Sequence, residues 1–182
     1  MKICIALLRG INVGGHHALP MKELVAMLEE LGARQIKTYI QSGNAVFVWN
    51  GKDISRLAHN LRAEIKRRRG FDAHVLLLEH ADLARVIQQN PFPEAGDDSA
   101  ALHAGFLAAV PENPDLRALE SLKSDSERFQ LVHKVFYLYA PEGIGRSKLA
   151  ARAERLLSVP MTDRNWRTVC TLWKMAQELK RS

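Results

Sequence analysis

Two short stretches near the amino terminus combine the residue types that bind anions. The first, residues 7–15 (LLRGINVGG), begins in an apolar run and brings a cation, an amide side chain and several glycines into one loop. Glycine adopts the left-handed backbone conformations that let successive amides point toward one ligand. The loop therefore predicts a backbone cradle for an anion, and a purely structural loop is the alternative. The residues assigned to this cradle are Arg9, Gly10, Asn12, Gly14 and Gly15.

The second stretch, residues 41–44 (QSGN), lies between two β-rich runs and is typical of a hairpin turn. A tight turn favours glycine or asparagine, but it does not need a polar amide on each side. We therefore assign Gln41, Ser42 and Asn44 to the same ligand site, with simple hairpin chemistry as the alternative. Neither stretch matches the nucleotide-binding patterns GxGxxG or GxxxxGK followed by Ser or Thr.

The second half of the chain contains two further basic segments. Residues 143–148 read GIGRSK, and residues 164–169 read RNWRTV. Lys148 and Arg167 would lie in first helical turns, where each cation opposes the helix dipole by roughly 0.3–1 kcal/mol. A bound anion would reverse that penalty. Trp166 is either a core residue or a stacking platform for a base. The candidate binding residues here are Arg146, Ser147, Lys148, Arg164, Asn165, Trp166 and Arg167.

The hydrophobic pattern of the first half predicts the elements that carry these loops. Strand-length apolar or β-rich runs alternate with stretches in which apolar residues recur every three or four positions. The expected strands are residues 3–8, 36–40, 45–49 and 73–78. The expected helices run from Pro20 to a stop at Gly32, from 54 to 70, and from 82 to 89.

The same order of elements recurs in the second half. Strands are expected at residues 102–109, 127–132, 135–140 and 160–164. Helices are expected from a cap at Asn113 with Pro114 in the first position, over 147–157, and from a cap at Asn165 onward. This predicts an α+β protein made of two tandem ferredoxin-like βαββαβ units, each followed by an extra helix. We place the units at residues 1–92 and 98–182, joined where Pro, Gly and Asp cluster at 91–99.

The ferredoxin-like topology predicts which loops meet. Strands one and two run in the same direction with strand three antiparallel between them. The loop 9–19, the turn 41–44 and the basic run 67–69 therefore share one edge of the first sheet. The helix that begins at Pro20 has no good N-cap, because Leu19 offers no side-chain acceptor. Its first amides are therefore available to an anion.

Several strands are apolar on both faces. Val46, Phe47, Val48 and Trp49 alternate to opposite sides of one strand. Helices on one face of a sheet would leave the other face in contact with water, so we expect that second face to be covered. The other repeat or a second subunit could provide the cover.

Composition and charge narrow the class of protein. The chain is 47% apolar and 25% charged, as in soluble globular proteins, and its net charge of +6 with a pI near 9.5 favours an anionic partner. The apolar run after Lys2 is too short for a signal peptide, and no run approaches the length of a membrane helix. We therefore expect a cytoplasmic protein with no membrane partner.

The cysteines and histidines show no spacing that indicates a metal or redox site. Cys4 and Cys170 do not form a CxxC pair, and we expect buried reduced thiols. No histidine has the spacing to cysteines or carboxylates that a metal requires. Ser42 and Ser147 have no identifiable histidine partner. Neither a metal nor a cofactor is expected.

Four motifs in order resemble the uncharacterised bacterial domain of unknown function 1697 family. They are ALLRGINVGG near the start, TYIQSGN before a strand, GIGRSK before a helix and RNWRTV before the closing helix. The resemblance covers essentially the whole chain. It implies a small cytoplasmic protein with tandem ferredoxin-like halves, and it brings no established activity and no catalytic residues. His16 and His17 beside the glycine pair are a local departure from the family pattern.

These observations favour a protein that binds a phosphate-bearing small molecule. In this hypothesis Arg9 and Arg167 are charge clamps, the Gly14 and Gly15 amides form the cradle, and Gln41 and Asn44 are polar readers. Nucleic-acid binding is the alternative, since ferredoxin-like RNA-recognition modules stack bases on exposed aromatic side chains, although the RNP1 pattern is absent here. A structural homodimer without a ligand is a further alternative. Catalysis stays open, and in an enzyme Lys148 or a histidine would supply the acid or base.

Overall fold

The computed structural model describes residues 1–96 and 99–181 of the chain. The chain divides into two compact units. The first unit contains Met1–Arg85 and Thr171–Ser182, and the second contains Val86–Cys170. The boundaries 1–92 and 98–182 stay a prediction from composition, and position 98 lies outside the described residues.

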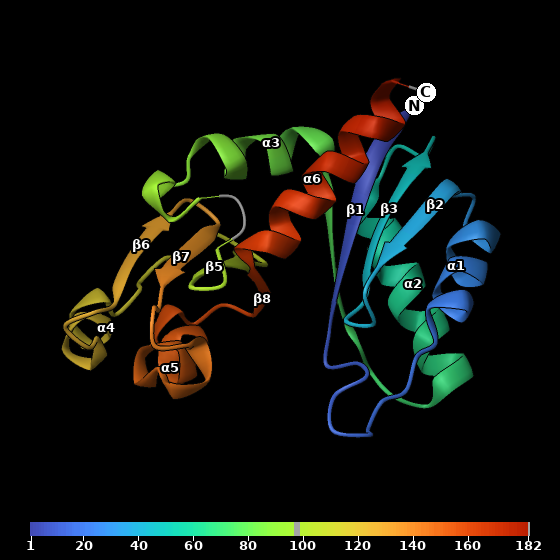
Figure 1. Ribbon diagram of the computed structural model, residues 1–182. Coiled ribbons are helices and arrows are strands. Elements are labelled where there is room, and N and C mark those ends of the chain that lie inside the picture. The colour runs from blue at the N-terminus through green and yellow to red at the C-terminus, as the bar shows by residue number, and fades with distance from the viewer. Residues whose placement is uncertain (97–98, 182) are drawn as a thin grey trace. The chain divides into compact units, whose positions relative to one another are not determined.

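The first unit is a four-stranded antiparallel sheet in the order β2-β3-β1-β4 (Figure 1). Its elements are β1 (Lys2–Arg9), α1 (Met21–Glu30), β2 (Arg34–Tyr39), β3 (Asn44–Trp49), α2 (Ile54–Arg69) and β4 (His74–Glu79), followed by α3 (His80–Gln88). This is the predicted βαββαβ arrangement, with β3 lying antiparallel between β1 and β2. The ferredoxin-like prediction for this half is confirmed.

One face of the first sheet packs against α1 and α2. Alternate residues of β1, Cys4, Ala6 and Leu8, are buried in the same apolar cluster as Leu24 of α1 and Leu61 of α2. The apolar residues that recur every two positions in the strand pack here against those that recur every three or four positions in the helices. Burial also raises the pKa of the Cys4 thiol to about 11, so this thiol stays protonated at neutral pH.

The opposite face of the first sheet is buried as well. Ile5, Leu7 and Val46 are at most 1% exposed. The part of helix α6 (Trp166–Arg181) that belongs to this unit contributes buried apolar residues from Leu172 onward, and its Glu178 pairs with Lys37 of β2 at 3.1 Å. The apolar face is thus buried within a single chain, and its composition does not require a second subunit.

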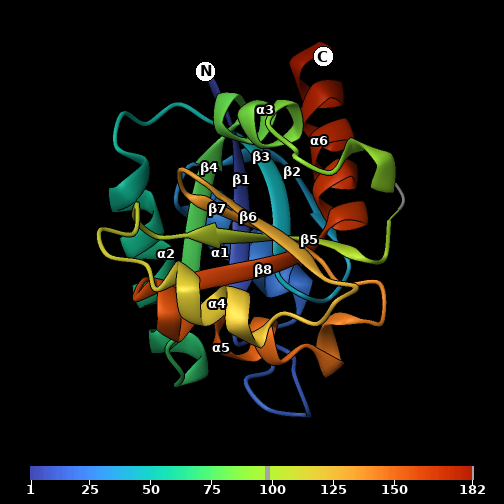
Figure 2. The ribbon, with the colours of Figure 1, turned by 90° about the vertical axis from the view of Figure 1, so that its left-hand side faces the viewer.

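The second unit repeats the arrangement, with a four-stranded antiparallel sheet in the order β6-β7-β5-β8. Its elements are η1 (Pro93–Ala95), β5 (Leu102–Leu107), α4 (Leu116–Leu122), β6 (Arg128–Val132), β7 (Val135–Tyr139), η2 (Ile144–Arg146), α5 (Lys148–Leu157) and β8 (Met161–Asn165), and α6 follows. Figure 2 gives a second view of both sheets. The protein is therefore α+β with two tandem ferredoxin-like units, as predicted.

Both faces of the second sheet are also covered. On one face Phe136 and Leu138 pack in a cluster with Leu149 of α5. On the other, the buried Tyr137 donates a hydrogen bond from its hydroxyl to the carbonyl oxygen of Val86 at 2.8 Å. The Trp166 ring at the start of α6 lies 6.2 Å from the Tyr137 ring. Burial raises the pKa of Tyr137 well above its usual range.

Several helix starts differ from the prediction: among them, α1 begins at Met21 instead of Pro20, α3 at His80 instead of Asp82, and α4 two residues after the predicted Pro114. Helix α4 begins at Leu116, two residues after Pro114, and its cap is Asp115. The Asp115 carboxylate accepts a hydrogen bond from the Ala118 amide at 2.9 Å, and the Asp115 amide donates to the Leu156 carbonyl at 2.9 Å. The second bond is a tertiary contact that anchors Asp115 outside the helix, and no local pattern around Asn113 could reveal it.

Candidate functional site

Asn12 ties together two of the predicted loops of the first unit. Its side-chain amide donates to the carbonyl oxygens of Gln41 at 2.7 Å and Leu19 at 2.9 Å, and its side-chain oxygen accepts from the Leu19 amide at 2.8 Å. Asn12 itself has a positive φ of 54°. We call the loop 10–19, the turn 40–43 and the end of α2 with Phe71 the rim of the first unit.

The glycine pair of the loop forms a tight hairpin turn. Gly14 and Gly15 have φ values of 58° and 78°, and the His16 amide donates to the Val13 carbonyl at 3.0 Å. Positive φ at both central positions is the pattern of a type I′ turn, which glycine adopts without strain. Both glycines are exposed, and a Cβ on either would meet nothing within 4 Å. Their surface is therefore open on the outer side.

The turn after β2 is built differently, around buried polar groups. Asn44 is fully buried and its side-chain amide donates to the Tyr39 carbonyl at 3.2 Å and the Ser42 hydroxyl at 2.8 Å. These bonds hold the turn, so Asn44 and Ser42 act here as structural groups. Gln41 is exposed. Ile40 has a φ of 49° and is 52% exposed, which is unfavourable for a β-branched residue.

The end of α2 joins the rim, as the topology predicts. Arg69 donates from Nε to the Ala18 carbonyl at 2.8 Å and pairs with Glu23 in the first turn of α1 at 3.3 Å. The imidazole of His17 stacks on the Phe71 ring at 4.7 Å, and its Nδ1 lies 2.8 Å from the Gly10 carbonyl. Sequence reasoning did not single out these contacts, because each joins positions far apart in the chain.

The basic run at the end of α2 is neutralised within its own unit. Arg67 pairs with Glu64 at 2.5 Å, and Arg68 pairs with both Glu64 and Glu30. Hydrogen bonds from Arg67 and Arg68 lower the pKa of Glu64 to about 2. Arg67 and Arg68 are therefore parts of an ion-pair network at the end of the helix.

Helix α1 begins without a side-chain cap. Pro20 stands at the cap position, and no side chain accepts from the first amides of the helix among the described residues. The Glu23 and Leu24 amides bond to the Pro20 carbonyl at 3.0 and 3.2 Å. Lys22 is exposed in this first turn. The prediction had Leu19 at the cap, whereas the structure has Pro20 there, and this residue likewise offers no side-chain acceptor.

In the second unit, the segment before α5 is a helix cap. The Ser147 hydroxyl accepts from the Ala150 amide at 2.9 Å, and Ser147 is 8% exposed. Arg146 and Lys148 on either side are exposed. The ends of β7 and β8 flank the start of β5, with Tyr139 opposite Leu102 and Asn165 opposite His103. The two basic segments of this unit thus begin at one end of the sheet.

The segment that ends β8 is mostly buried. Trp166 is 2% exposed, and Asn165 caps α6 by accepting from the Arg167 amide at 3.0 Å. Arg164 is 9% exposed, and burial lowers the pKa of its guanidinium to about 10. Its Nη1 donates to the Asp163 carbonyl at 2.8 Å. Arg167 is the exposed cation of this segment.

A histidine–carboxylate pair lies in the second sheet and was not predicted. His103 Nδ1 and Asp163 Oδ2 are 2.9 Å apart, and the His103 residue is 7% exposed. The pair joins adjacent strands β5 and β8. A carboxylate that orients an imidazole is a common arrangement in acid–base sites, but it is also an ordinary cross-strand contact.

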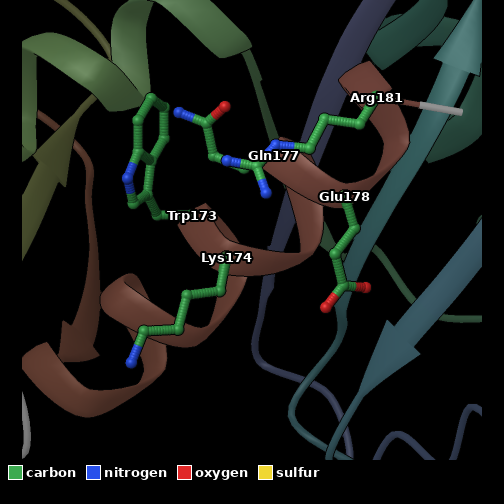
Figure 3. A pocket seen from close by; sticks show the side chains of 5 residues that line it. All are labelled: Trp173, Lys174, Gln177, Glu178 and Arg181. Carbon is green, nitrogen blue, oxygen red and sulfur yellow. The ribbon is translucent and has the colours of Figure 1, made fainter.

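A hollow of about 500 Å³ lies along the part of α6 that belongs to the first unit (Figure 3). Its lining residues are Trp173, Lys174, Gln177, Glu178 and Arg181. The Trp173 ring lies 4.7 Å from the His80 ring. Burial lowers the pKa of His80, and the charge of Lys180 lowers it further. The stripe of Trp173, Gln177 and Arg181, each one helical turn apart, is the signal that could have located this hollow in the sequence.

Several strand aromatics lack the exposure that base stacking needs. Phe47, Phe136 and Tyr137 are at most 2% exposed. RNA-recognition sheets stack bases on aromatic side chains that face solvent. These strand positions and Trp166 therefore do not form such a platform.

Neither a metal cluster nor a membrane-spanning helix occurs among the described residues. No group of three or more His, Cys, Asp or Glu side chains within them is placed to hold a metal ion. No helix within residues 1–96 and 99–181 combines the length and apolar character that crossing a membrane requires.

Tandem ferredoxin-like units with a glycine-rich loop after the first strand define the class of protein. The family model described as Protein of unknown function (DUF1697) matches residues 1–137, and the chain belongs to this family. The matched span contains the loop 7–15 and the turn 41–44. The motifs at 143–148 and 164–169 lie beyond it.

A solved structure supports the same fold over the whole chain. It is that of the conserved bacterial protein SP0830 from Streptococcus pneumoniae, with 26% sequence identity and a TM-score of 0.71. The match covers 96% of this chain and 98% of that chain. No curated protein matches the sequence.

Proposed function

We propose that the rim of the first unit binds a phosphate-bearing small molecule. The observation that carries this proposal is the clamp by Asn12, which fixes the glycine-rich loop against the turn 40–43 beside the uncapped start of α1. Exposed loop amides next to a helix N-terminus are a common arrangement for holding phosphate groups. A loop that is already ordered loses little conformational entropy when the ligand arrives.

The exposed members of the predicted set carry the binding roles. Gly10, Gly14 and Gly15 present backbone without side chains, and a Cβ on any of them would meet nothing within 4 Å. Gln41 offers an exposed amide side chain beside them. The half-buried Arg9 adds positive charge where β1 ends. In this proposal Asn12, Ser42 and Asn44 hold the rim in shape.

Electrostatics favours the same ligand class. The chain has a net charge of +6, and exposed Lys22 lies in the first turn of α1, where a cation opposes the helix dipole. An anion at the rim would turn that unfavourable interaction into a favourable one. In the second unit, Arg146, Lys148 and Arg167 are exposed cations, and the proposal keeps them as a separate anion-binding segment of that unit.

A thermal-shift panel tests the proposal. The full chain is heated with inorganic phosphate, a nucleoside triphosphate and a sugar phosphate, each at millimolar concentration. A ligand at one hundred times its Kd stabilises the folded state by about 2.7 kcal/mol. The melting temperature should rise for at least one phosphate compound and stay constant for the matched dephosphorylated compound. An unchanged melting temperature across the panel would contradict the proposal.

Three variants locate the binding. Arg9→Gln should reduce the shift, whereas Arg152→Gln, which removes an exposed cation from α5 of the second unit, should leave it unchanged. Trp173→Ala tests the hollow on α6 as the competing site. If Trp173→Ala abolishes the shift and Arg9→Gln does not, the ligand binds in the hollow and the rim proposal is wrong. Binding of single-stranded RNA and DNA is measured at two salt concentrations. Binding that weakens at the higher salt would support the nucleic-acid alternative, and no binding at low salt would exclude it.

A further inference from the structure

Strand β4 is an edge of the first sheet with no charged residue in its interior, and its last residue, Glu79, forms an ion pair with Lys2 of β1. It pairs with β1 on one side, and no strand among the described residues pairs with its outer side (Figure 2). Its interior, Val75 to Leu78, contains four apolar residues and no charge, and all four side chains are half-buried. An uncharged apolar edge is a ready template for another strand.

The other sheet edges are protected. Strand β2 has a register irregularity between Arg34 and Lys37, and Lys37 is held in an ion pair with Glu178. Strand β6 begins with Arg128, which pairs with Glu94 at 2.7 Å. Strand β8 carries Asp163, Arg164 and Asn165 in its five residues. Bulges and charges of this kind discourage edge-to-edge pairing. Like β6, β4 has a charged residue at one end, but its interior is four consecutive apolar residues, whereas the interior of β6 contains the polar Gln130.

The hydrogen bonds of the neighbouring strands show which backbone groups of β4 point outward. The Leu8 amide donates to the Gly43 carbonyl on the β3 side. The backbone N–H and C=O groups of the alternate residues Leu7 and Ile5 in β1 therefore point toward β4. Their partners in β4 are Leu76 and Leu78. The backbone N–H and C=O groups of Val75 and Leu77 must therefore point away from the sheet.

The end of β4 supports this assignment. The amide of Glu79 donates to the Asp82 carboxylate at 2.9 Å, outside the β1 ladder. Every second residue of a strand directs its backbone groups to the same side. Glu79 follows Val75 and Leu77 in this alternation, so its outward amide agrees with outward N–H and C=O groups at these two positions. The amide of Glu79 is occupied by the start of α3, which leaves Val75 and Leu77 as the available pairing positions.

We propose that β4 pairs antiparallel with β4 of a second copy of this chain, about a two-fold axis at Leu76. Outward-facing residues must oppose outward-facing residues, so Val75 lies across from Leu77 of the second copy, and Leu77 across from its Val75. Leu76 then faces its own counterpart in a non-hydrogen-bonded pair. The two four-stranded sheets become one continuous sheet.

The sequence of β4 is complementary to itself in this register. A two-fold interface places the same surface against itself, so every outward donor needs an outward acceptor in the same strand. Val75 and Leu77 satisfy each other, and no charged residue between the strand ends faces a like charge. On the helix-covered face, Val75 and Leu77 extend the apolar cluster, and on the other face Leu76 packs against Leu76 of the partner subunit.

Cross-linking tests the register. The Cα atoms of a non-hydrogen-bonded antiparallel pair lie about 4.5 Å apart, which a disulfide can span. Under mild oxidation, L76C should form a covalent dimer. The matched control Q130C, in the middle of edge strand β6, should remain mostly uncross-linked. The native cysteines are buried and should not contribute.

Solution mass tests the assembly. Sedimentation equilibrium of the wild-type chain should give twice the 20.5 kDa chain mass, and L76K, which places two lysines at the axis, should give the single chain mass. Circular dichroism checks that L76K is folded, and if it is not, the L76C result decides alone. A wild-type monomer together with L76C that cross-links no more than Q130C overturns the proposal and leaves the edge to a strand of another protein.

Discussion

The side-chain amide of Asn12 lies 2.7 Å from the main-chain carbonyl oxygen of Gln41, although the two residues are 29 positions apart. The same side chain also bonds to the amide and the carbonyl of Leu19. One asparagine therefore closes the glycine-rich loop on itself and fastens it to the neighbouring turn.

Replacing Asn12 by alanine should destabilise the protein by about 1–3 kcal/mol, since the N–H and C=O groups of buried Leu19 lose their partner. Alanine at a φ of 54° adds further strain. Asn12→Gly loses the same hydrogen bonds but tolerates the backbone, so it separates the two effects. Urea unfolding of both variants makes the measurement. Equal stability of Asn12→Ala and the wild type would show that the clamp has no energetic role.

Two glycines of similar backbone conformation should respond differently to alanine. A Cβ on Gly43 would lie 2.7 Å from both Leu8 and Ile11, whereas a Cβ on Gly14 would meet nothing within 4 Å. Both have positive φ, so each substitution costs about 1 kcal/mol of backbone strain. Gly43→Ala should cost about 1–3 kcal/mol more through overpacking. Thermal unfolding of the pair should therefore give the lower melting temperature for Gly43→Ala, and the reverse order would contradict the packing argument.

The elements that sequence predicted are those with strong local signals. Leu24 and Leu28 recur on one helical face, and Gly70 ends α2 in the left-handed conformation with a φ of 77°. These features depend on neighbours within one or two turns, and the chain order of the elements then restricts the topology to few choices. The meeting of loop 9–19 with the turn 41–44 followed from that topology.

The roles of individual side chains in the candidate site could not be predicted in the same way. The sequence does not show whether an asparagine such as Asn44 binds a ligand or stabilises a turn. Its burial and its hydrogen bond to the Tyr39 carbonyl assign the second role. Arg68 pairs with Glu30 of a different helix, and the sequence around Arg68 does not indicate this partner. Such contacts depend on packing between elements, which no local pattern encodes.

Relieving the strain at Ile40 should stabilise the protein. Ile40 is 52% exposed and has a φ of 49°, so it buries little and stays in a conformation that β-branched residues rarely adopt. Asparagine tolerates this conformation, and Ile40→Asn should raise stability by about 1 kcal/mol. Val13→Asn, at another exposed apolar position without a positive φ, should have little effect. Differential scanning calorimetry of both variants gives the comparison, and a gain at both positions would point to solubility instead of strain.

The ion-pair network at the end of α2 should make stability depend on acid pH through Glu64. Arg67 and Arg68 hold its folded-state pKa at about 2, below the ordinary glutamate value of about 4.3. The contribution of the carboxylate is therefore fully present above its unfolded pKa and is lost as pH falls toward the folded value. The melting temperatures of wild type and Glu64→Gln should differ most above pH 5 and converge near pH 2. Glu112→Gln, which removes an exposed glutamate of the second unit, is the matched control for the loss of one carboxylate. A carboxyl titration of Glu64 by NMR with a midpoint near 4 would contradict the network.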